Sequence, residues 1–253
     1  MNLSHRFDGP EDAPVLVLSN SLGTTLDLWE LQVHGLARGH RVLRYDHRGH
    51  GGSPVPPGPY TIAELAGDLL ELLDRLEVER VSFCGLSLGG VVGMWLGANA
   101  PERIDRLVVA CSSARFGTRD AWIERAAGVR ADGTESIADA VVARWFTPEF
   151  AVQQPQVVGR FREMVAGTPD EGYAACCDAL RDWDFRDELG RVAPSTLLIV
   201  GELDPVVSAV DTEVLFERIP DARVRVIEGV AHLANVPQPE EFKQAVLSHL
   251  EAS

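Results

Sequence analysis

The sequence has few cysteines and no long apolar run. Its four cysteines, Cys84, Cys111, Cys176 and Cys177, fit no spacing of a zinc site, and two of them sit inside apolar runs. No stretch reaches the roughly 18 uninterrupted apolar residues of a membrane span, and the first residues lack the apolar core of a secretory signal. We therefore predict no metal, no structural disulfide, no association with a membrane and a cytoplasmic location.

Basic residues are also scarce. Lysines and arginines number 23, against 38 aspartates and glutamates, which gives a formal net charge of −15 at pH 7. Because nucleic-acid backbones are bound by clustered cations, this balance argues against a nucleic-acid partner. A negatively charged substrate would be repelled at long range, so it would need a cation inside its binding site.

Short runs of aliphatic and β-branched residues recur between turn residues. The strands that we predict from them cover residues 15–19, 41–45, 80–84, 107–111, 196–200 and 223–227. Their apolar character is nearly continuous rather than alternating, which is typical of a parallel sheet covered on both faces. The clearest helix between them covers residues 62–76 and follows a capping box of Thr61 and Glu64. The fold class is therefore α/β, with a mostly parallel, doubly wound sheet.

The alternation of strands and helices stops at residue 114 and resumes after residue 184. The residues between show helical patterns but no strand pattern; the patterns cover residues 122–129, 137–146, 157–165 and 172–181. A helical insertion between two strands is the simplest interpretation. We therefore predict a core of residues 1–113 and 185–253 and an inserted helical lid of residues 114–184.

A candidate nucleophile follows the predicted strand at residues 80–84. The next five residues read GLSLG and centre on Ser87, and an apolar helical pattern begins directly after them. This motif between a strand and a helix is typical of a serine in a sharp turn, where larger flanking residues would clash with neighbouring backbone. The same glycines would suit an ordinary turn, so the motif predicts a nucleophile only where a base and an acid accompany it.

Both partners follow in the order that such a serine requires. A serine hydroxyl becomes a good nucleophile when a histidine removes its proton and a carboxylate orients that histidine. Asp204 follows the predicted strand at residues 196–200, and His232 follows the one at residues 223–227. Each would lie in a loop at the carboxyl end of its strand. We predict Ser87 as the nucleophile, His232 as the base and Asp204 as the orienting acid.

Other residues compete for the roles of base and acid. Glu202 and Glu228 are close in sequence to the chosen residues, and Asp204 is preferred because it lies deeper in its loop. His47 and His50 directly follow a predicted strand and could line a pocket. The remaining histidines lie near the termini, in loops or on a surface helix, where solvent exposure is expected.

Acyl transfer also requires hydrogen-bond donors for the oxyanion of the tetrahedral intermediate. The Leu88 N–H, directly after the serine, is one candidate. The second should come from the loop after an early strand, where we choose the Leu22 N–H within residues 19–24. This loop lacks the His-Gly pair of many esterases, but a backbone amide donates whatever its side chain.

The motifs resemble those of the α/β-hydrolase superfamily across essentially the whole chain. They occur in the order LSNSLGT, DHRGHGGS, GLSLGG, GELDPVV and GVAHLANVPQPEEF. Together with RWFTPEF in the insertion, they most closely resemble the 3-oxoadipate enol-lactone hydrolases of the protocatechuate branch of aromatic degradation. The resemblance implies an α/β-hydrolase fold with a helical lid, and a Ser-His-Asp acyl-enzyme mechanism without a metal or an organic cofactor.

The resemblance also implies a substrate, a small lactone that carries a free carboxylate and is opened to 3-oxoadipate after attack by Ser87. The carboxylate requires a cationic or strongly donating partner. The lid offers five arginines: Arg115, Arg119, Arg125, Arg130 and Arg144. Each could equally be a solvated surface residue. We name Arg130 and Arg144 as candidates for substrate binding, with Trp145 as an aromatic residue that lines the pocket or packs in the core.

Other activities share this pattern of residues. A cofactor-free haloperoxidase or perhydrolase would use the same three side chains with peroxide in place of water, and a small carboxylesterase would take a simple ester. A haloalkane dehalogenase is disfavoured, because it needs a carboxylate where Ser87 stands. A non-catalytic module that only binds a ligand is the alternative of a different class, and the intact set of three residues argues against it. The sequence does not indicate an oligomeric state.

Overall fold

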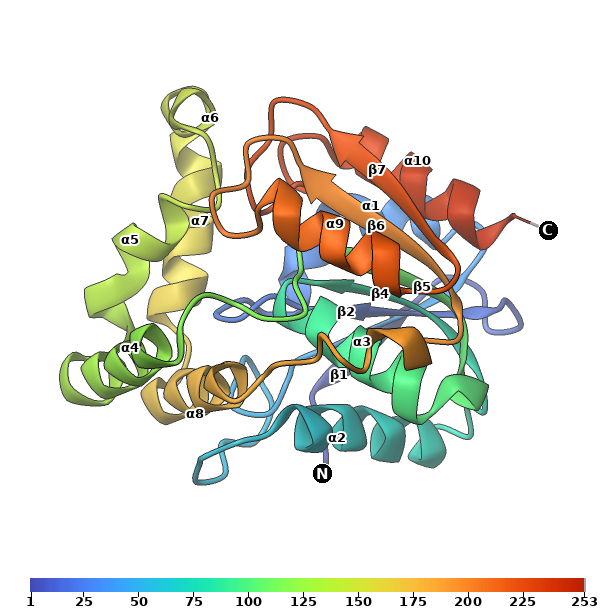
Figure 1. The fold of residues 1–253 in the computed structure, drawn as a ribbon, viewed down its shortest axis with the longest axis horizontal. Helices are drawn as coiled ribbons and strands as arrows, with labels where there is room; N and C mark the ends of the chain where they lie inside the picture. The colour runs from blue at the N-terminus through green and yellow to red at the C-terminus, as the bar shows by residue number, and fades with distance from the viewer. Residues whose placement is uncertain (253) are drawn as a thin grey trace.

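A seven-stranded sheet runs through the centre of the structure, a computed structural model that describes residues 1–252 (Figure 1). Its strands are β1 (His5–Asp8), β2 (Val15–Ser19), β3 (Arg41–Tyr45), β4 (Val81–Leu86), β5 (Ile104–Ala110), β6 (Ser195–Gly201) and β7 (Ala222–Ile227). They lie in the order β1-β3-β2-β4-β5-β6-β7, and of these strands only β1 is antiparallel to its neighbour. The predicted α/β class with a mostly parallel sheet is confirmed.

The six predicted strands are all present, with ends that differ from the prediction by no more than three residues. The largest difference is at β5, which begins at Ile104 because Ile104 already pairs with β4 and Arg106 with β6, although Asp105 and Arg106 are polar. Strand β1 was not predicted. It is four residues long and mostly exposed at the edge of the sheet, so it has no apolar run to indicate it.

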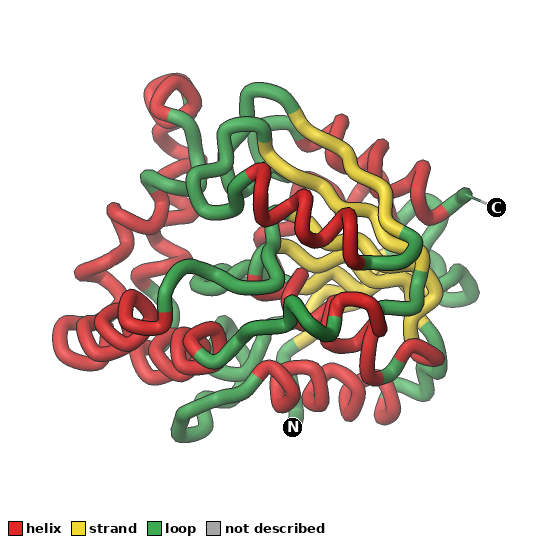
Figure 2. The backbone as a smooth tube through the Cα atoms, in the orientation of Figure 1, coloured by secondary structure: helices red, strands yellow, loops and turns green. Residues whose placement is uncertain are grey.

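Helices cover both faces of the sheet (Figures 1 and 2). One layer contains α2 (Ile62–Arg75), α3 (Leu88–Asn99) and α9 (Ala209–Arg218), and the opposite layer contains α1 (Glu30–Leu36) and α10 (Pro239–Leu250). Short 3₁₀ helices join some of these elements: η1 (Leu26–Trp29), η2 (Pro101–Arg103), η3 (Thr134–Ile137) and η4 (Leu189–Arg191). Both faces of the sheet are therefore withdrawn from water, as its continuous apolar strands require.

Helix α2 shows how the sequence pattern sets its layer. Leu65, Leu69 and Leu72 recur at helical spacing and are buried. The predicted capping box is present, since the Thr61 hydroxyl accepts from the Glu64 N–H at 3.2 Å and the Glu64 carboxylate accepts from the Thr61 N–H at 2.9 Å. Two otherwise unpaired backbone donors are satisfied, and the start of the helix is fixed.

The chain between β5 and β6 forms a cluster of helices at the left of Figure 1 and contains no strand among its described residues. These helices are α4 (Arg119–Asp132), α5 (Ala138–Val142), α6 (Pro148–Gln153), α7 (Pro155–Ala166) and α8 (Asp170–Arg181). Helix α4 packs against α8, and α5 packs against α7. Helix α6 was not predicted, because its six residues begin at a proline and bury none of their side chains.

The two ends of this insertion lie side by side. The Phe185 N–H donates to the Ala114 carbonyl at 2.9 Å, and the Trp183 Nε1–H donates to the Ser113 carbonyl at 3.1 Å. The Trp183 and Phe185 rings stack with their centroids 4.6 Å apart. The division of the chain into a core and a lid of residues 114–184 stays a prediction. The structure shows that residues at the two ends of the predicted lid contact each other.

No helix within residues 1–252 combines the length and the apolar character needed to cross a membrane. The four cysteines are free and buried. Burial raises the pKa of each thiol, so all four keep their protons and pack as small apolar side chains.

Helix α8 meets the core through backbone atoms. A Cβ atom added at Gly172 would lie 2.1 Å from the Gly49 carbonyl oxygen, in the loop after β3. Gly49 itself has a φ of +76°, a conformation that favours glycine. The absence of side chains at both positions therefore brings helix α8 directly onto the loop after β3.

We expect Gly172→Ala to destabilise the protein by about 1–3 kcal/mol, because the new methyl group would push the two backbones apart. Gly128→Ala is the matched control, since Gly128 lies in α4 with no atom within 4 Å of an added Cβ. This control should stabilise the protein by about 0.5–1 kcal/mol through its higher helix propensity. Urea unfolding of both variants measures the difference, and equal stabilities would contradict the close contact.

Candidate active site

Ser87 lies in a sharp turn between β4 and α3. Its φ of 55° and ψ of −111° are strained for a residue with a side chain. A Cβ atom at Gly85 would lie 2.2 Å from the Gly89 carbonyl oxygen, and one at Gly89 would lie 2.2 Å from the Ser19 carbonyl oxygen. Only glycine fits at these two positions, and the turn presents the Ser87 hydroxyl beyond the end of the sheet.

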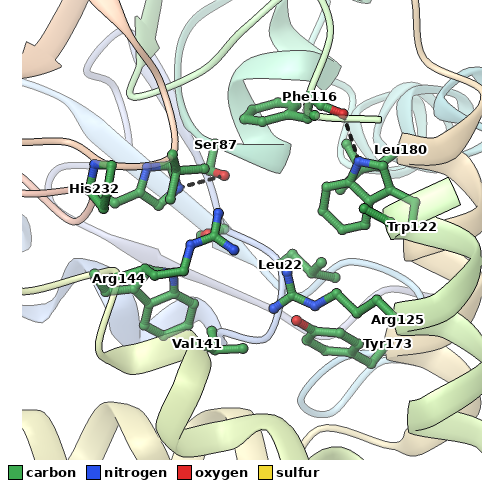
Figure 3. A pocket seen from close by; sticks show the side chains of 16 residues that line it. Leu22, Ser87, Phe116, Trp122, Arg125, Val141, Arg144, Tyr173, Leu180 and His232 are labelled. Carbon is green, nitrogen blue, oxygen red and sulfur yellow. Dashed lines mark hydrogen bonds between the residues drawn. The ribbon is translucent and has the colours of Figure 1, made fainter. Parts of the chain in front are cut away.

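His232 and Asp204 meet Ser87 from two separate loops. The His232 Nε2 lies 3.0 Å from the Ser87 Oγ, and the His232 Nδ1 lies 2.8 Å from the Asp204 Oδ2 (Figure 3 shows the first of these bonds). The side chains of His232 and Asp204 are 2% and 1% exposed. The three residues named from the sequence thus form one hydrogen-bonded chain.

Hydrogen bonds fix the direction of this chain. The Asp204 Oδ1 accepts from the Val206 N–H at 2.7 Å and from the Val207 N–H at 3.2 Å, which leaves Oδ2 to face the histidine. Because a carboxylate oxygen accepts, the His232 Nδ1 is assigned the proton and Nε2 is free to accept from the Ser87 hydroxyl. This is the arrangement in which a histidine can remove a serine proton.

The competing residues lie elsewhere. The Glu202 carboxylate accepts from the Gly229 N–H at 2.9 Å, and Glu228 is exposed. His47 and His50 are buried within the core and do not line the cavity that contains Ser87. His249 was expected to be solvated, but it is buried, and its Nε2 lies 3.1 Å from the Ser195 carbonyl oxygen.

Two backbone amides are available near the serine hydroxyl. Leu88 is the first residue of α3, where an N–H has no partner within the helix. Leu22 lines the same cavity as Ser87, and its N–H finds no acceptor within residues 1–252. The structure therefore brings both predicted oxyanion donors to the side of the sheet where Ser87 lies, and their role stays a prediction.

The cavity beside Ser87 has a volume of about 360 Å³ and lies between the core and the helices of the insertion (Figure 3). Its walls combine the serine and histidine with residues of the lid and of the loop after β6. The lining residues are Ser21, Leu22, Ser87, Phe116, Gly117, Ala121, Trp122, Arg125, Val141, Arg144, Trp145, Tyr173, Leu180, Pro205, Val206 and His232.

Two arginines extend into this cavity. Arg125 and Arg144 point their guanidinium groups toward its centre in Figure 3, and neither forms an ion pair with a carboxylate within residues 1–252. Partial burial and the nearby charge of Arg125 lower the pKa of Arg144, although a guanidinium stays protonated. The two side chains therefore place unpaired positive charge close to Ser87.

Arg130, the other arginine named from the sequence, does not line the cavity. Its guanidinium donates to the Glu171 carboxylate at 2.9 Å and to the Asp178 carboxylate at 2.8 Å. These ion pairs join α4 to α8 and account for the position of the Arg130 side chain without a bound ligand. The structure therefore does not bring Arg130, a predicted substrate-binding residue, to the cavity, and Arg125 lies there instead.

Tyr173 was not predicted from the sequence and lies beside Arg125. Its hydroxyl is buried and has no hydrogen-bond partner among the described residues, and the Arg125 Cζ lies 5.4 Å from the centre of its ring. Burial raises the pKa of Tyr173, so the phenol keeps its proton and remains a donor. A buried donor without a partner indicates that a polar group of a ligand can be bound here.

Trp145 both lines the cavity and packs in the lid. Its ring meets Phe161 edge to face with centroids 6.4 Å apart, and its side chain is 4% exposed. Its carbonyl oxygen accepts from the Leu233 N–H at 3.1 Å, directly beside His232. Trp145 therefore lines the cavity and also packs against another aromatic residue, which are the two interpretations that the sequence left open.

Within residues 1–252, no group of three or more histidine, cysteine, aspartate or glutamate side chains is arranged to hold a metal ion. The polar side chains that surround the cavity include two serines, a histidine, two arginines and a tyrosine, most of which donate hydrogen bonds. The site is therefore built to bind oxygen atoms of negatively charged or polarised groups.

The chain belongs to the α/β-hydrolase family, since residues 14–239 match the family model described as alpha/beta hydrolase fold. It is 41% identical over 244 residues to 3-oxoadipate enol-lactonase 2 of Acinetobacter baylyi, across 96% of this chain and 91% of that protein. The crystal structure of the enol-lactonase of Burkholderia xenovorans is similar with a TM-score of 0.97 and 39% identity, covering 99% of this chain and 96% of that one. A putative carbamate hydrolase of Pseudomonas savastanoi is 31% identical over 95% of each chain.

We expect Asp204→Asn to lower kcat by about 1,000- to 10,000-fold, because an amide no longer fixes the His232 tautomer or stabilises its protonated form. Glu202→Gln changes a neighbouring carboxylate that does not contact the histidine, so kcat should stay at the wild-type value. Steady-state kinetics with an aryl acetate measures both variants. An equal loss of kcat in the two variants would contradict the role of Asp204 as the residue that orients His232.

Proposed function

We propose that the protein hydrolyses 3-oxoadipate enol-lactone to 3-oxoadipate, in the protocatechuate branch of the β-ketoadipate pathway and in the cytoplasm. The observation that carries this proposal is the pair of unpaired arginines, Arg125 and Arg144, in the same cavity as Ser87. A lactone that bears a free carboxylate has one group for each part of this cavity, a carbonyl for the serine and an anion for the arginines. The names of the enol-lactonase relatives support the same substrate.

Attack on the lactone begins at Ser87. Its Oγ bonds to the ring carbonyl carbon while the His232 Nε2 takes the hydroxyl proton, and Asp204 stabilises the imidazolium that forms. The carbonyl oxygen becomes an oxyanion that accepts from the Leu22 and Leu88 N–H groups. The ring C–O bond then breaks. Its oxygen leaves as an enolate, which needs little assistance from an acid because its charge is delocalised, and this enolate takes the proton from His232, which becomes neutral again.

Release of the product uses the same histidine. Because the leaving oxygen belongs to the ring, the opened substrate stays attached to Ser87 as a single acyl group. His232 removes a proton from water, whose oxygen attacks the acyl carbon, and the proton returns to the Ser87 Oγ as the ester bond breaks. The released enol becomes the ketone of 3-oxoadipate, and the enzyme is restored without a cofactor.

Three side chains on the lid side of the cavity would hold the substrate carboxylate. Arg125 and Arg144 supply charge-assisted hydrogen bonds, and the Tyr173 hydroxyl adds a donor that has no other partner among the described residues. With the carboxylate held there, the lactone carbonyl lies toward Ser87. The charge of this subsite also offsets the repulsion that a net charge of −15 exerts on an anion.

The size of the cavity favours a small substrate. Its volume of about 360 Å³ lies near the lower end of the roughly 300–1,000 Å³ typical of ligand pockets. Trp122, Val141 and Trp145 supply apolar walls for a compact ring. A long acyl chain would not fit without displacement of the lid.

We expect freshly prepared 3-oxoadipate enol-lactone to be hydrolysed with a kcat/KM about 100-fold above that for 4-nitrophenyl acetate, because hydrogen bonds to a charged group contribute roughly 1.5–3 kcal/mol. Loss of the ultraviolet absorbance of the lactone measures the rate. Good ester cleavage with poor lactone turnover would indicate a general esterase or perhydrolase instead. Inactivity toward both substrates would favour a ligand-binding module.

The arginines can be tested separately from the catalytic residues. Arg125→Met and Arg144→Met keep the apolar part of the side chain and should each raise KM for the lactone by about 10- to 100-fold, with little change for a neutral aryl acetate. Arg130→Met is the matched control, because it loses ion pairs outside the cavity and should leave KM unchanged. A similar effect on both substrates would show that the arginines support folding rather than carboxylate binding.

A further inference from the structure

We propose that His50 is a positioning residue for hydrolysis, because its imidazole holds the turn that presents the Leu22 N–H to the substrate oxyanion. The proposal rests on the serine-hydrolase mechanism given above. His50 is 0% exposed, does not line the cavity and contacts none of the three residues of the hydrogen-bonded chain. It acts on the reaction only through the backbone that it holds.

The hydrogen bond to the turn has a defined direction. The His50 Nε2 lies 3.0 Å from the Gly23 backbone nitrogen, which can only donate, so Nε2 is the acceptor. The proton of the ring is then on Nδ1, which faces the Arg48 carbonyl oxygen at 3.3 Å. Burial lowers the pKa of His50 to about 4, so the ring is neutral near pH 7 and keeps this acceptor.

The turn held by His50 carries the predicted oxyanion donor. It is closed by the Thr24 N–H, which donates to the Ser21 carbonyl at 3.2 Å, and by the Thr24 hydroxyl, which donates to the same oxygen at 2.8 Å. The Ser21 carbonyl and the Leu22 N–H belong to one planar peptide unit, so the two bonds to this carbonyl set the direction of the Leu22 N–H. The bond from the Gly23 N–H to His50 holds the next peptide unit, and together these bonds restrain both sides of Leu22.

The loop that carries His50 provides a rigid support. The His50 N–H donates to the His47 carbonyl, and the Ser53 N–H donates to the His50 carbonyl, both at 3.0 Å. The neighbouring Gly49 lies against the backbone of Gly172 in helix α8 of the lid. The imidazole thus joins the oxyanion turn to a loop that is held from both sides.

The test compares His50→Leu with His50→Gln in the full-length enzyme. Leucine leaves the Gly23 N–H without an acceptor, and kcat should fall by about 10- to 100-fold, less than the roughly 100- to 1,000-fold cost of deleting an oxyanion donor. KM should change by less than about twofold, because substrate carbonyl binding precedes oxyanion formation. The Gln side-chain oxygen can accept at similar reach and should restore most of kcat.

His249→Leu is the matched control. His249 is also buried and also contacts one backbone carbonyl, that of Ser195, but it lies on α10 away from the cavity. This variant should lose a similar amount of thermal stability and keep the wild-type kcat. An unchanged kcat in His50→Leu, or equal losses of kcat in the Leu and Gln variants, would overturn the proposal.

A spectroscopic measurement separates this proposal from the proposed function. In the wild-type enzyme, a phosphonate that labels Ser87 should shift the Leu22 amide proton downfield in an NMR spectrum, and the shift should be smaller in His50→Leu and restored in His50→Gln. Failure of the phosphonate to label Ser87 would overturn the hydrolase function. Normal labelling with an equal Leu22 shift in all three proteins would overturn only the role of His50.

If His50→Leu does not fold, His50→Asn replaces it in both measurements, since the shorter amide of asparagine cannot reach the Gly23 N–H.

Discussion

The close approach of backbone segments around Ser87 is the constraint on which the whole site depends. A Cβ atom at Gly89 would lie 2.2 Å from the Ser19 carbonyl oxygen, and one at Gly201 would lie 2.2 Å from the Ala231 carbonyl oxygen. The first contact brings the start of α3 against the end of β2, just before the turn of Leu22, and the second brings the loop of His232 against the end of β6. The hydrogen-bond distances of the site follow from this packing, since a methyl group at either glycine would force the segments apart.

The sequence predicted the hydrogen-bonded chain of three residues for a geometric reason. Ser87, Asp204 and His232 each follow a strand of one parallel sheet, and the carboxyl ends of such strands meet at one edge. The core strands were predicted for a similar reason, because burial on both faces makes them continuously apolar. Strand β1 and helix α6 escaped prediction, since both are short and largely exposed, and only their neighbours in space determine their structure.

The side chains of the helical insertion that reach the cavity were harder to predict from the sequence. Arg125 and Arg130 are five residues apart on α4, which is about 140° around a helix, so only one of them can face the cavity. Helix α4 buries only Ala126 and Val129, and this short apolar stripe does not indicate which side faces the core. Tyr173 lies in a helix whose residues are almost all buried, so its sequence context suggests packing alone. Contacts between helices determine which of these side chains reach the cavity. The periodicity of a single helix does not reveal such contacts.

The hydrogen bond from the Leu233 N–H to the Trp145 carbonyl, 3.1 Å long, ties the helical insertion to the residue next to His232. Any outward displacement of this part of the lid has to break the bond, and the broken bond loosens the residue next to His232. The position of this part of the insertion and the position of the His232 loop are therefore coupled through one backbone contact, although the two segments lie far apart in the sequence.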